Sequence, residues 1–401
     1  MLGAVSGSRP KARKIQENDM SGEVVELCRQ MVGAASVNPQ DKDCLEEPYG
    51  ESRMAALVAG WLREAKLEPQ VQEVSPGREN VLAVAQGKDT SKTLLLCGHM
   101  DTVDVQDMTI DPFDPQIRDG RIYGRGACDD KGPLATLMIA FRDRVQQGDL
   151  PCNLVLLASC GEEYELNGAR YWAKHCSGDL AGIVIAEPTR LDVVVAHKGV
   201  ARVHLVTRGK SAHSSIPELG KNAIYIMGRA LPVVEEFGKK LAARPAHPLL
   251  NTETLSVTMI QGGQQINVIP DKCTANIDWR ILPGRQPEKC RKELAAALRE
   301  QLKESVEVEM INAYESMETS AQHPLVKALL RAGDKATGKC QPISVGYATD
   351  ASAFTHLGIP TPIFGPGDGS QAHTQDEYID IEHLEKGLAA YHEFLQGDWG
   401  I

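Results

Sequence analysis

Residues 94–101 read LLLCGHMD, an apolar run that stops at Gly98 and is followed by a histidine and an aspartate. A short, continuous apolar run predicts a strand that is buried on both faces of a sheet, here at residues 93–97. Alternate residues of an extended segment point to the same side, so His99 and Asp101 face the same way. One of them could bind a metal while the other orients it. A buried histidine satisfied by its neighbouring aspartate is the alternative.

Segments with helical and strand periodicity alternate around this strand. Apolar residues at three- and four-residue spacing indicate amphipathic helices, and short apolar runs indicate buried strands. The helices are expected at 23–35, 51–65 and 132–144, and the further strands at 81–84, 153–158 and 182–186. This alternation predicts an α/β fold with helices on both faces of the sheet, where ligands collect at the carboxyl ends of the strands.

The pattern changes near Val195, where residues begin to alternate between apolar and polar as in a half-exposed strand. Strands expected at 200–207, 253–260, 272–280 and 306–311, with helices at 222–241 and 286–305, give the β-α-β-β-α-β order of a ferredoxin-like unit. Helix and strand alternation then returns and ends with a helix at 382–396. We expect a flexible lead-in of residues 1–20, then an α/β domain of residues 21–196 and 312–401, interrupted by an inserted α+β domain of residues 197–311.

The amino-acid composition argues against some classes of partner. Of 401 residues, 43 are Lys or Arg and 54 are Asp or Glu, for a net charge of −11. This acidic balance argues against a non-specific nucleic-acid partner, which needs a basic surface. No run approaches the roughly 18 apolar residues of a membrane span, so no membrane is expected. The 10 cysteines are scattered without a C-x-x-C pair, which favours free thiols in the cytoplasm.

Pairs of carboxylates recur where predicted strands end. Asp129 and Asp130 follow a glycine-rich turn, where Asp129 could instead cap the next helix. Glu162 and Glu163 come just after the 153–158 strand, and adjacent carboxylates are costly there unless they are exposed or counter-charged. A divalent cation would supply that charge, and a solvated pair is the alternative.

Two more candidate ligands lie further along the chain. Glu187 stands at the end of the 182–186 strand, before a proline, and His373 lies in a glycine-rich loop. Two histidines with several carboxylates suit one or two Zn²⁺ or similar ions, because nitrogen and oxygen ligands select such metals. Because these histidines and carboxylates recur at the ends of predicted strands, a metal centre is the leading interpretation.

Taken together, these motifs resemble the M20 metallopeptidase family, which includes acetylornithine deacetylases, succinyl-diaminopimelate desuccinylases, aminoacylases and carnosinases. The motifs are His99-x-Asp101, Gly124-Arg125-Gly126-x-x-Asp129-x-Lys131-Gly132, Gly161-Glu162-Glu163, Glu187-Pro188-Thr189 and Ala372-His373. The resemblance runs from about Gly22 to the C-terminus. It implies a zinc exopeptidase-like mixed sheet with an inserted lid and dimerisation domain.

The resemblance also implies a role for each site residue. One Zn²⁺ would be bound by His99, Asp129 and Glu187, and the second by Asp129, Glu163 and His373, with Asp129 bridging. Co²⁺ could substitute for Zn²⁺. Asp101 would orient His99, and Glu162 would be the general base. Only the family pattern selects Asp129 rather than Asp130 as the bridge.

Further family motifs lie in the inserted segment. They are Gly209-Lys210-Ser211-Ala212-His213, Asn222-Ala223, Gly262-Gly263-x-x-x-Asn267 and Asp278-x-Arg280. In such relatives the histidine matching His213 reaches the partner subunit's active site and stabilises the oxyanion, which implies a homodimer. Asn267 and Arg280 match positions that hold the substrate. By themselves, His213 could be merely exposed and Arg280 merely salt-bridged.

The implied activity is metal-dependent hydrolysis of the amide bond of a small N-acyl amino acid, by a water that the metals activate. The chain is most similar to acetylornithine deacetylases or succinyl-diaminopimelate desuccinylases. A dipeptidase or carboxypeptidase of the same family is the alternative, because the Asp129-Asp130-Lys131-Gly132-Pro133 version of the motif resembles the dipeptidase branch. A non-catalytic metal-binding protein is a further one, although Glu162 is not needed as a ligand.

Overall fold

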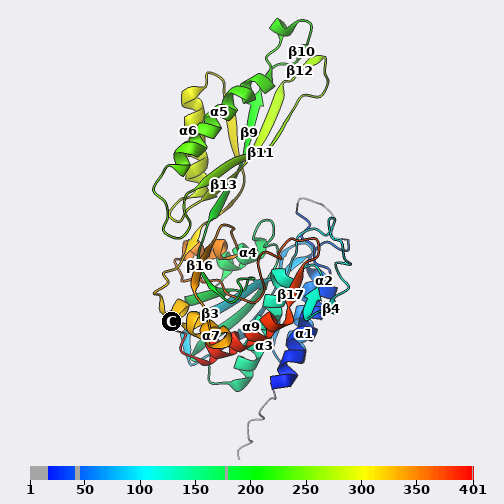
Figure 1. The fold of residues 1–401 in the computed structure, drawn as a ribbon, viewed down its shortest axis with the longest axis vertical. Coiled ribbons are helices and arrows are strands. Elements are labelled where there is room, and N and C mark those ends of the chain that lie inside the picture. The colour runs from blue at the N-terminus through cyan, green and yellow to red at the C-terminus, as the bar shows by residue number, and fades with distance from the viewer. Residues whose placement is uncertain (1–16, 41–45, 177–178, 400) are drawn as a thin grey trace, which may run out of the picture.

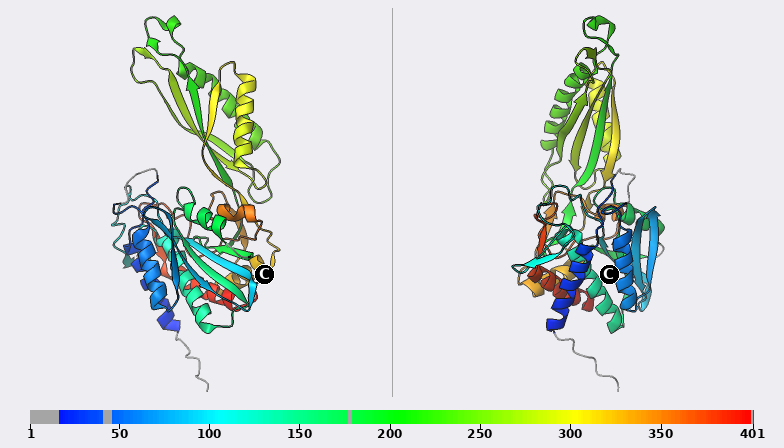
Figure 2. Two further views of the ribbon diagram at one scale, coloured as in Figure 1. Left: turned by 180° about the vertical axis from the view of Figure 1, so that it is seen from behind. Right: turned by 90° about the vertical axis from the view of Figure 1, so that its right-hand side faces the viewer.

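The computed structural model describes residues 17–40, 46–176, 179–399 and 401. Figure 1 shows an elongated molecule with two parts, a rounded body and an upright extension above it. The extension contains β9 to β14, residues 199–314, and is called the lid below; the remaining described residues are the body. The two views of Figure 2 show that the lid is narrow when seen edge-on and that it rises from one end of the body.

A mixed sheet runs through the body. Five strands lie in the order β1-β2-β6-β3-β7, in which β3 is parallel to β6 and β7, whereas β2 is antiparallel to both of its neighbours. Their bounds are Pro69–Ser75, Arg78–Ala85, Cys152–Ser159, Asp89–His99 and Leu180–Ile185. The parallel centre brings the carboxyl ends of β3, β6 and β7 to one edge, where ligands are expected.

Residues 360–364 extend this sheet. They hydrogen-bond to β7 through the N–H groups of Ile183 and Ile185, and to β8 through a reciprocal pair between Val194 and Ile363. β8 (Val193–His197) in turn pairs with β15 (Met317–Glu318) and β16 (Pro342–Val345). Segments from both sides of the lid insertion therefore complete one sheet.

The apolar run of β3 separates two cores. Leu94 and Leu96 belong to the larger core on one face of the sheet, while Leu95 and Cys97 belong to the core on the other face. This division follows from the two-residue period of a strand. The larger core contains buried residues from α1, α2, α3, α7 and α9, and the smaller contains those of α4 and α8. The predicted mixed α/β sheet with helices on both faces is confirmed.

The helix bounds in the body are Glu17–Gly33 (α1), Ser52–Glu64 (α2), Gly132–Gln147 (α3), Asn167–His175 (α4), Pro324–Thr337 (α7), Ala351–Phe354 (α8) and Ile381–Gln396 (α9). Two short turns are η1 (Ala127–Lys131), just before α3, and η3 (Thr355–Leu357). A small sheet in the order β17-β5-β4 (Tyr378–Asp380, Arg121–Tyr123 and Gln116–Arg118) lies beside η1. None of the helices in the described ranges combines the length and apolar character that a membrane crossing requires.

The lid has the predicted ferredoxin-like arrangement. Its antiparallel sheet has the order β11-β13-β9-β14, with bounds Thr254–Gly262, Lys272–Ile281, Gly199–Arg208 and Val306–Tyr314. Helices α5 (Ala223–Ala242) and α6 (Pro287–Gln301) pack with this sheet in a core that contains Trp279. α5 begins where the Asn222 side chain accepts the N–H of Ile224 at 2.9 Å, as an N-cap residue should.

Several elements were not predicted. β1, α4 and β8 are among them, and so is the two-stranded tip of the lid, where β10 (Ala212–His213) pairs with β12 (Val268–Ile269) near the turn η2 (Pro217–Leu219). The expected lead-in falls outside the described residues for positions 1–16, while α1 already begins at Glu17. β14 continues to Tyr314, beyond the expected end of the insert at residue 311.

Candidate metal centre

The predicted ligands gather at the carboxyl edge of the body sheet. His99 is the last residue of β3, while Glu162 and Glu163 follow β6, and Glu187 follows β7. Asp129 lies in η1 and His373 in the loop before β17. The short strands and their turns therefore bring distant parts of the sequence to one place, as expected for ligands at the carboxyl ends of parallel strands.

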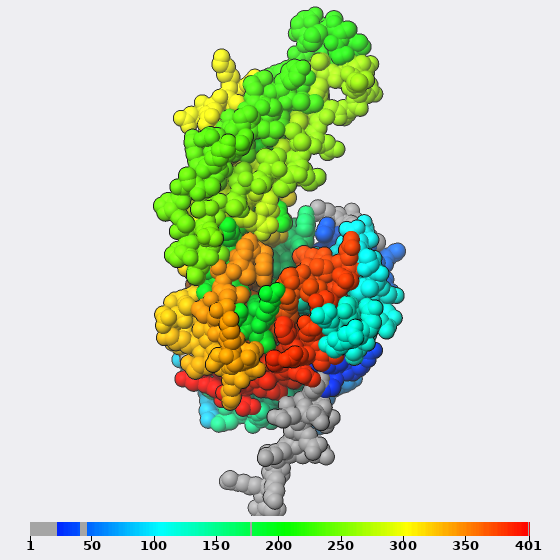
Figure 3. Space-filling model, in the orientation of Figure 1, coloured from blue at the N-terminus to red at the C-terminus, as the bar shows by residue number. Residues whose placement is uncertain are grey.

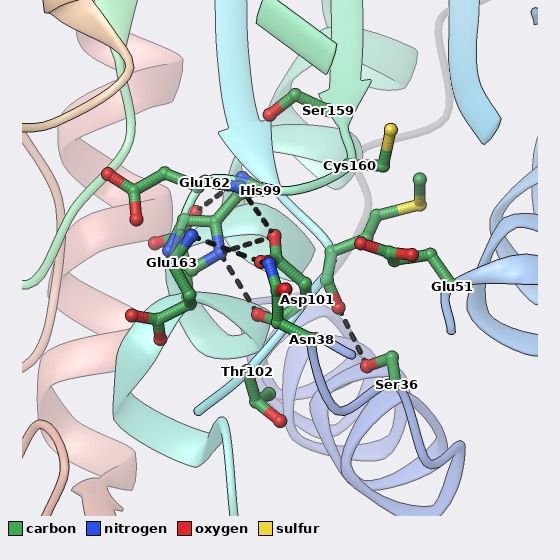
Figure 4. A network of polar contacts seen from close by, with 12 residues as sticks. Ser36, Asn38, Glu51, His99, Asp101, Thr102, Ser159, Cys160, Glu162 and Glu163 are labelled. Carbon is green, nitrogen blue, oxygen red and sulfur yellow. Dashed lines mark hydrogen bonds and ion pairs between the residues drawn. The ribbon is translucent and has the colours of Figure 1, made fainter. Parts of the chain in front are cut away.

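Asp101 is the organising carboxylate of this edge, as Figure 4 shows. Its Oδ1 accepts the main-chain N–H of Glu162 at 3.0 Å, and its Oδ2 accepts those of Glu163 at 3.1 Å and the Asn38 side chain at 2.7 Å. Nδ1 of His99 lies 3.0 Å from the Asp101 carbonyl oxygen and 3.5 Å from Oδ1. Asp101 therefore fixes the Nδ1 side of the ring, which leaves Nε2, on the side of Asp129, as the nitrogen that could bind a metal.

Asp129 lies between the two histidines. Its Oδ1 is 3.0 Å from Nε2 of His99, and its Oδ2 is 3.4 Å from Nε2 of His373. The same His373 nitrogen is 3.1 Å from Oε2 of Glu163. One carboxylate thus faces a different imidazole with each oxygen, which is the arrangement a bridging ligand requires.

A cavity of ≈ 400 Å³ lies next to this group. Its walls include Asp129, Glu162, Glu163, Glu187 and His373 from the body. In the space-filling view the lid, green and yellow, stands over the orange and orange-red segments of the body from residues 340–380 (Figure 3). The cavity lining also includes Arg202 and Arg280 of the lid, so the two parts of the molecule bound it together.

The carboxylates of the centre are buried without enough positive charge. Burial raises the pKa of Glu187 and of Glu162 well above the usual value, and the negative charge of neighbouring carboxylates adds to this. Burial, followed by the charge of Asp129, raises the pKa of Glu163 to about 7. The hydrogen bonds of His373 to Asp129 and Glu163 raise its own pKa to about 11. Such a cluster favours a bound cation.

The donor set suits a divalent metal. His99, Asp129 and Glu163 offer ligand atoms that all lie within 4.8 Å of one another. Oε1 of Glu163 is buried and has no hydrogen-bond partner among the described residues, which is costly unless a cation faces it. Nitrogen and oxygen ligands are those that Zn²⁺ and similar ions take. Glu187 lies outside this tightest group but lines the same cavity.

Asp130 is turned away from the cavity. Its Oδ2 accepts the main-chain N–H of His99 at 3.1 Å, and its side chain is completely buried. The Asp129–Asp130 peptide bond is cis. The geometry therefore separates the two neighbouring carboxylates, and only Asp129 faces the histidines.

Sequence reasoning missed Glu377, the carboxylate that holds the Asp129 loop. Oε1 accepts the N–H groups of Cys128 at 2.9 Å and Asp129 at 3.0 Å. Oε2 accepts the N–H of Gly126 at 3.0 Å and the Arg125 guanidinium at 2.8 Å. Glu377 is one acid in a polar stretch four residues after His373, so only its position in space distinguishes it.

The predicted lid residues lie in two places. Arg280 lines the cavity together with Arg202 of β9. His213 and Asn267 instead lie at the distal tip of the lid, where the Asn267 carbonyl accepts the N–H of Ser214 at 2.9 Å. Figure 1 places this tip, marked by β10 and β12, at the far end from the body. The structure thus does not bring His213 or Asn267 to the cavity of their own chain.

Comparison with known proteins gives concordant results. The family model described as "Peptidase family M20/M25/M40" matches residues 95–397. The acetylornithine deacetylase of Proteus mirabilis is 32% identical over 372 residues, which is 90% of this chain and 93% of that protein.

Solved structures of low sequence identity share the fold. An M20 family metallo-carboxypeptidase from Sulfolobus solfataricus superposes with a TM-score of 0.75 at 21% identity, covering 93% of this chain and 98% of that one. Human carnosine dipeptidase 1 superposes with a TM-score of 0.71 at 17% identity, covering 95% and 98%.

Proposed function

The chain belongs to peptidase family M20/M25/M40, and from that premise we propose that it hydrolyses the amide bond of small N-acyl amino acids with two bound divalent cations, Zn²⁺ or Co²⁺. The observation that carries the proposal is the Asp129 carboxylate, which faces His99 with one oxygen and His373 with the other. His99 and Glu187 would complete one metal site with Asp129, and Glu163 and His373 the other.

The metals and the protein side chains would have different roles in the hydrolysis. Bound cations supply Lewis-acid activation of a water and of the scissile carbonyl. Glu162 faces the same cavity and, in this proposal, accepts a proton from the attacking water. It then delivers that proton to the leaving amine as the C–N bond breaks.

Asp101 contributes by positioning. It contacts the His99 ring and the main chain of both glutamates, so it holds a proposed ligand and the proposed base at fixed places. Arg280 lines the cavity, which supports the role in substrate binding implied by the resemblance. Asn267 and His213 could take part only from another subunit, because both lie at the lid tip.

A homodimer would supply these two residues. β11 is an edge strand of the lid sheet, and its Val257, Met259 and Ile260 side chains are 37%, 65% and 56% exposed. An unpaired strand edge with exposed apolar side chains is a ready surface for pairing with a second copy. We therefore propose that dimerisation places His213 near the partner's cavity, to stabilise the oxyanion.

A dipeptidase or carboxypeptidase activity is the second candidate. The low-identity neighbours named above, a metallo-carboxypeptidase and a carnosine dipeptidase, favour it. A C-terminal residue of a dipeptide and the amino acid of an N-acyl amino acid present the same amide and carboxylate. A panel of N-acetyl amino acids and dipeptides therefore separates the two by the ratio of their kcat/KM values.

The central test is Glu162→Gln in the metal-loaded enzyme. We expect kcat to fall by roughly 10² to 10⁴, typical for loss of a positioned acid and base, while metal content measured by plasma mass spectrometry stays unchanged. Glu163→Gln should instead lower metal occupancy. Glu165→Gln is the matched control, since Glu165 is an exposed neighbour. A fully active Glu162→Gln enzyme would remove the proposed base.

A further inference from the structure

Two guanidinium groups of the lid face the cavity and share one carboxylate. Arg202 and Arg280 both line the cavity. Oδ2 of Asp278 lies 3.3 Å from Nε of Arg202 and 3.2 Å from Nη2 of Arg280. Oδ1 of Asp278 accepts a bond from Nε of Arg280 at 2.6 Å. Two positive charges against one negative charge leave this wall of the cavity net positive.

Arg202 has unused hydrogen-bonding capacity. Neither of its terminal nitrogens has an acceptor among the residues that the structure describes, and its only ion pair there is the contact with Asp278 through Nε. Its guanidinium carbon lies 5.9 Å from the centroid of the Tyr314 ring, a cation–π distance that helps to hold the side chain in place. The donors of a planar guanidinium match a carboxylate.

Each carboxylate in the described cavity lining already has a proposed role in metal binding or catalysis. The carboxylates among the described lining residues are Asp129, Glu162, Glu163 and Glu187, which are the proposed metal ligands and the proposed base. No acid of that lining is left to pair with a cationic substrate side chain. A desolvated ammonium without a partner would be unfavourable there.

We propose that the substrate carries a second anionic group besides its α-carboxylate, and that Arg202 selects for this group while Arg280 holds the α-carboxylate. This inference rests on the proposed amidohydrolase function. The second carboxylate can belong to the amino acid, as in N-acetyl-glutamate, or to the acyl arm, as in N-succinyl-alanine. The shared chemistry is an N-acyl amino acid with two carboxylates.

The experiment compares charged substrates with neutral isosteres of the same size. The pairs are N-acetyl-glutamate with N-acetyl-glutamine, and N-succinyl-alanine with its succinamoyl analogue. N-acetyl-ornithine is included as a substrate with a cationic side chain. We expect kcat/KM for one charged member to exceed that of its isostere by roughly tenfold or more, the effect of one charge-assisted hydrogen bond. The preferred pair shows where the second carboxylate lies.

Arg202→Gln should abolish this preference, and Arg202→Lys should keep part of it. Arg208→Gln is the matched control, because Arg208 lies on the same strand, pairs with Glu307 at the surface and is not part of the cavity lining. Titration calorimetry of the Glu162→Gln enzyme provides a second readout, with the charged member of the preferred pair expected to bind roughly tenfold more tightly than its isostere.

The outcomes are distinguishable. If N-acetyl-ornithine or the neutral isosteres are preferred, or if Arg202→Gln keeps the wild-type ratio, the inference is wrong and the hydrolase proposal stands. If the metal-loaded enzyme cleaves no member of the panel and no dipeptide, the proposed function falls and this inference falls with it.

Discussion

His197 is a titratable side chain that the body encloses completely. Its Nδ1 lies 2.9 Å from the Lys198 carbonyl oxygen, so this nitrogen carries the proton, and Nε2 is buried without a partner among the described residues. Burial lowers the pKa of His197 from 6.5 to about 4. His197 therefore binds a proton less tightly in the folded protein than in the unfolded chain.

This asymmetry predicts an acid-dependent loss of stability. The contribution of the neutral His197 to the free energy of unfolding is fully present above pH 6.5, the pKa in the unfolded chain. It declines as the pH falls toward 4, the pKa in the folded protein. Between pH 7 and 5 the free energy of unfolding should fall by about 2 kcal/mol more in the wild type than in His197→Gln. Urea denaturation of both proteins at the two pH values measures the difference, in which the other titrating groups cancel. Equal slopes would contradict the buried, neutral imidazole.

The Asp129 loop, the next larger unit, depends on Glu377. Glu377→Gln keeps the size of the side chain but replaces one acceptor oxygen by an NH₂ group and leaves the Arg125 guanidinium buried beside a neutral amide. We expect metal affinity to fall about tenfold to a hundredfold, as for other groups that orient a ligand. Competition with a chromophoric chelator measures the affinity. Glu382→Gln is the control, since Glu382 is exposed and pairs with Lys386 on α9.

Another local feature is the close approach between the start of β9 and the chain at the end of β14, which are antiparallel neighbours at the base of the lid. A Cβ atom at Gly199 would lie 2.6 Å from both Ser316 N and the Tyr314 carbonyl oxygen. These are backbone atoms that cannot move aside cheaply.

Gly199→Ala should therefore lower the free energy of unfolding by roughly 1–3 kcal/mol, the usual cost of overpacking. Gly228→Ala is the matched change, because its Cβ would have nothing within 4 Å. In the middle of α5 it should stabilise the protein by about 0.5–1 kcal/mol. Thermal unfolding followed by circular dichroism reports both, and equal melting temperatures for the two variants would contradict the close backbone approach at Gly199.

At this scale, sequence patterns predict buried elements better than exposed ones. The apolar run that forms β3 identifies the strand and places His99 at its end. β1 was missed because residues 69–75 include Gln70, Gln72 and Glu73 and form an edge strand without a fully buried residue. Residues 360–364 carry two prolines and take their place between β7 and β8 only through pairing with both. Glu377 was missed because its role also depends on contacts between distant parts of the chain: its partners lie about 250 residues away.

For the whole molecule, the separation of the lid tip from the cavity predicts shared active sites. His213→Ala and Glu162→Gln should each be inactive alone, yet a mixture refolded together should regain activity. In a mixed dimer, one cavity would receive an intact Glu162 and an intact His213 from different subunits, giving roughly a quarter of wild-type activity at random pairing. Light scattering establishes the oligomeric state. A monomer, or a mixture that stays inactive, would contradict the homodimer as the source of His213.

The order in which the proposed metal ligands occur along the chain has a consequence for synthesis. His99, Asp129, Glu163 and Glu187 precede the lid, whereas His373 and Glu377 follow it. At ribosomal rates of about 5–20 residues per second, the later pair emerges roughly ten seconds or more after Glu187. Throughout that interval the nascent body has its acids without the second imidazole or the glutamate that fixes the Asp129 loop. If these residues bind the metals as proposed, a cation that reaches the growing chain early would find an incomplete site, and tight binding would have to wait until the residues after the lid are synthesised.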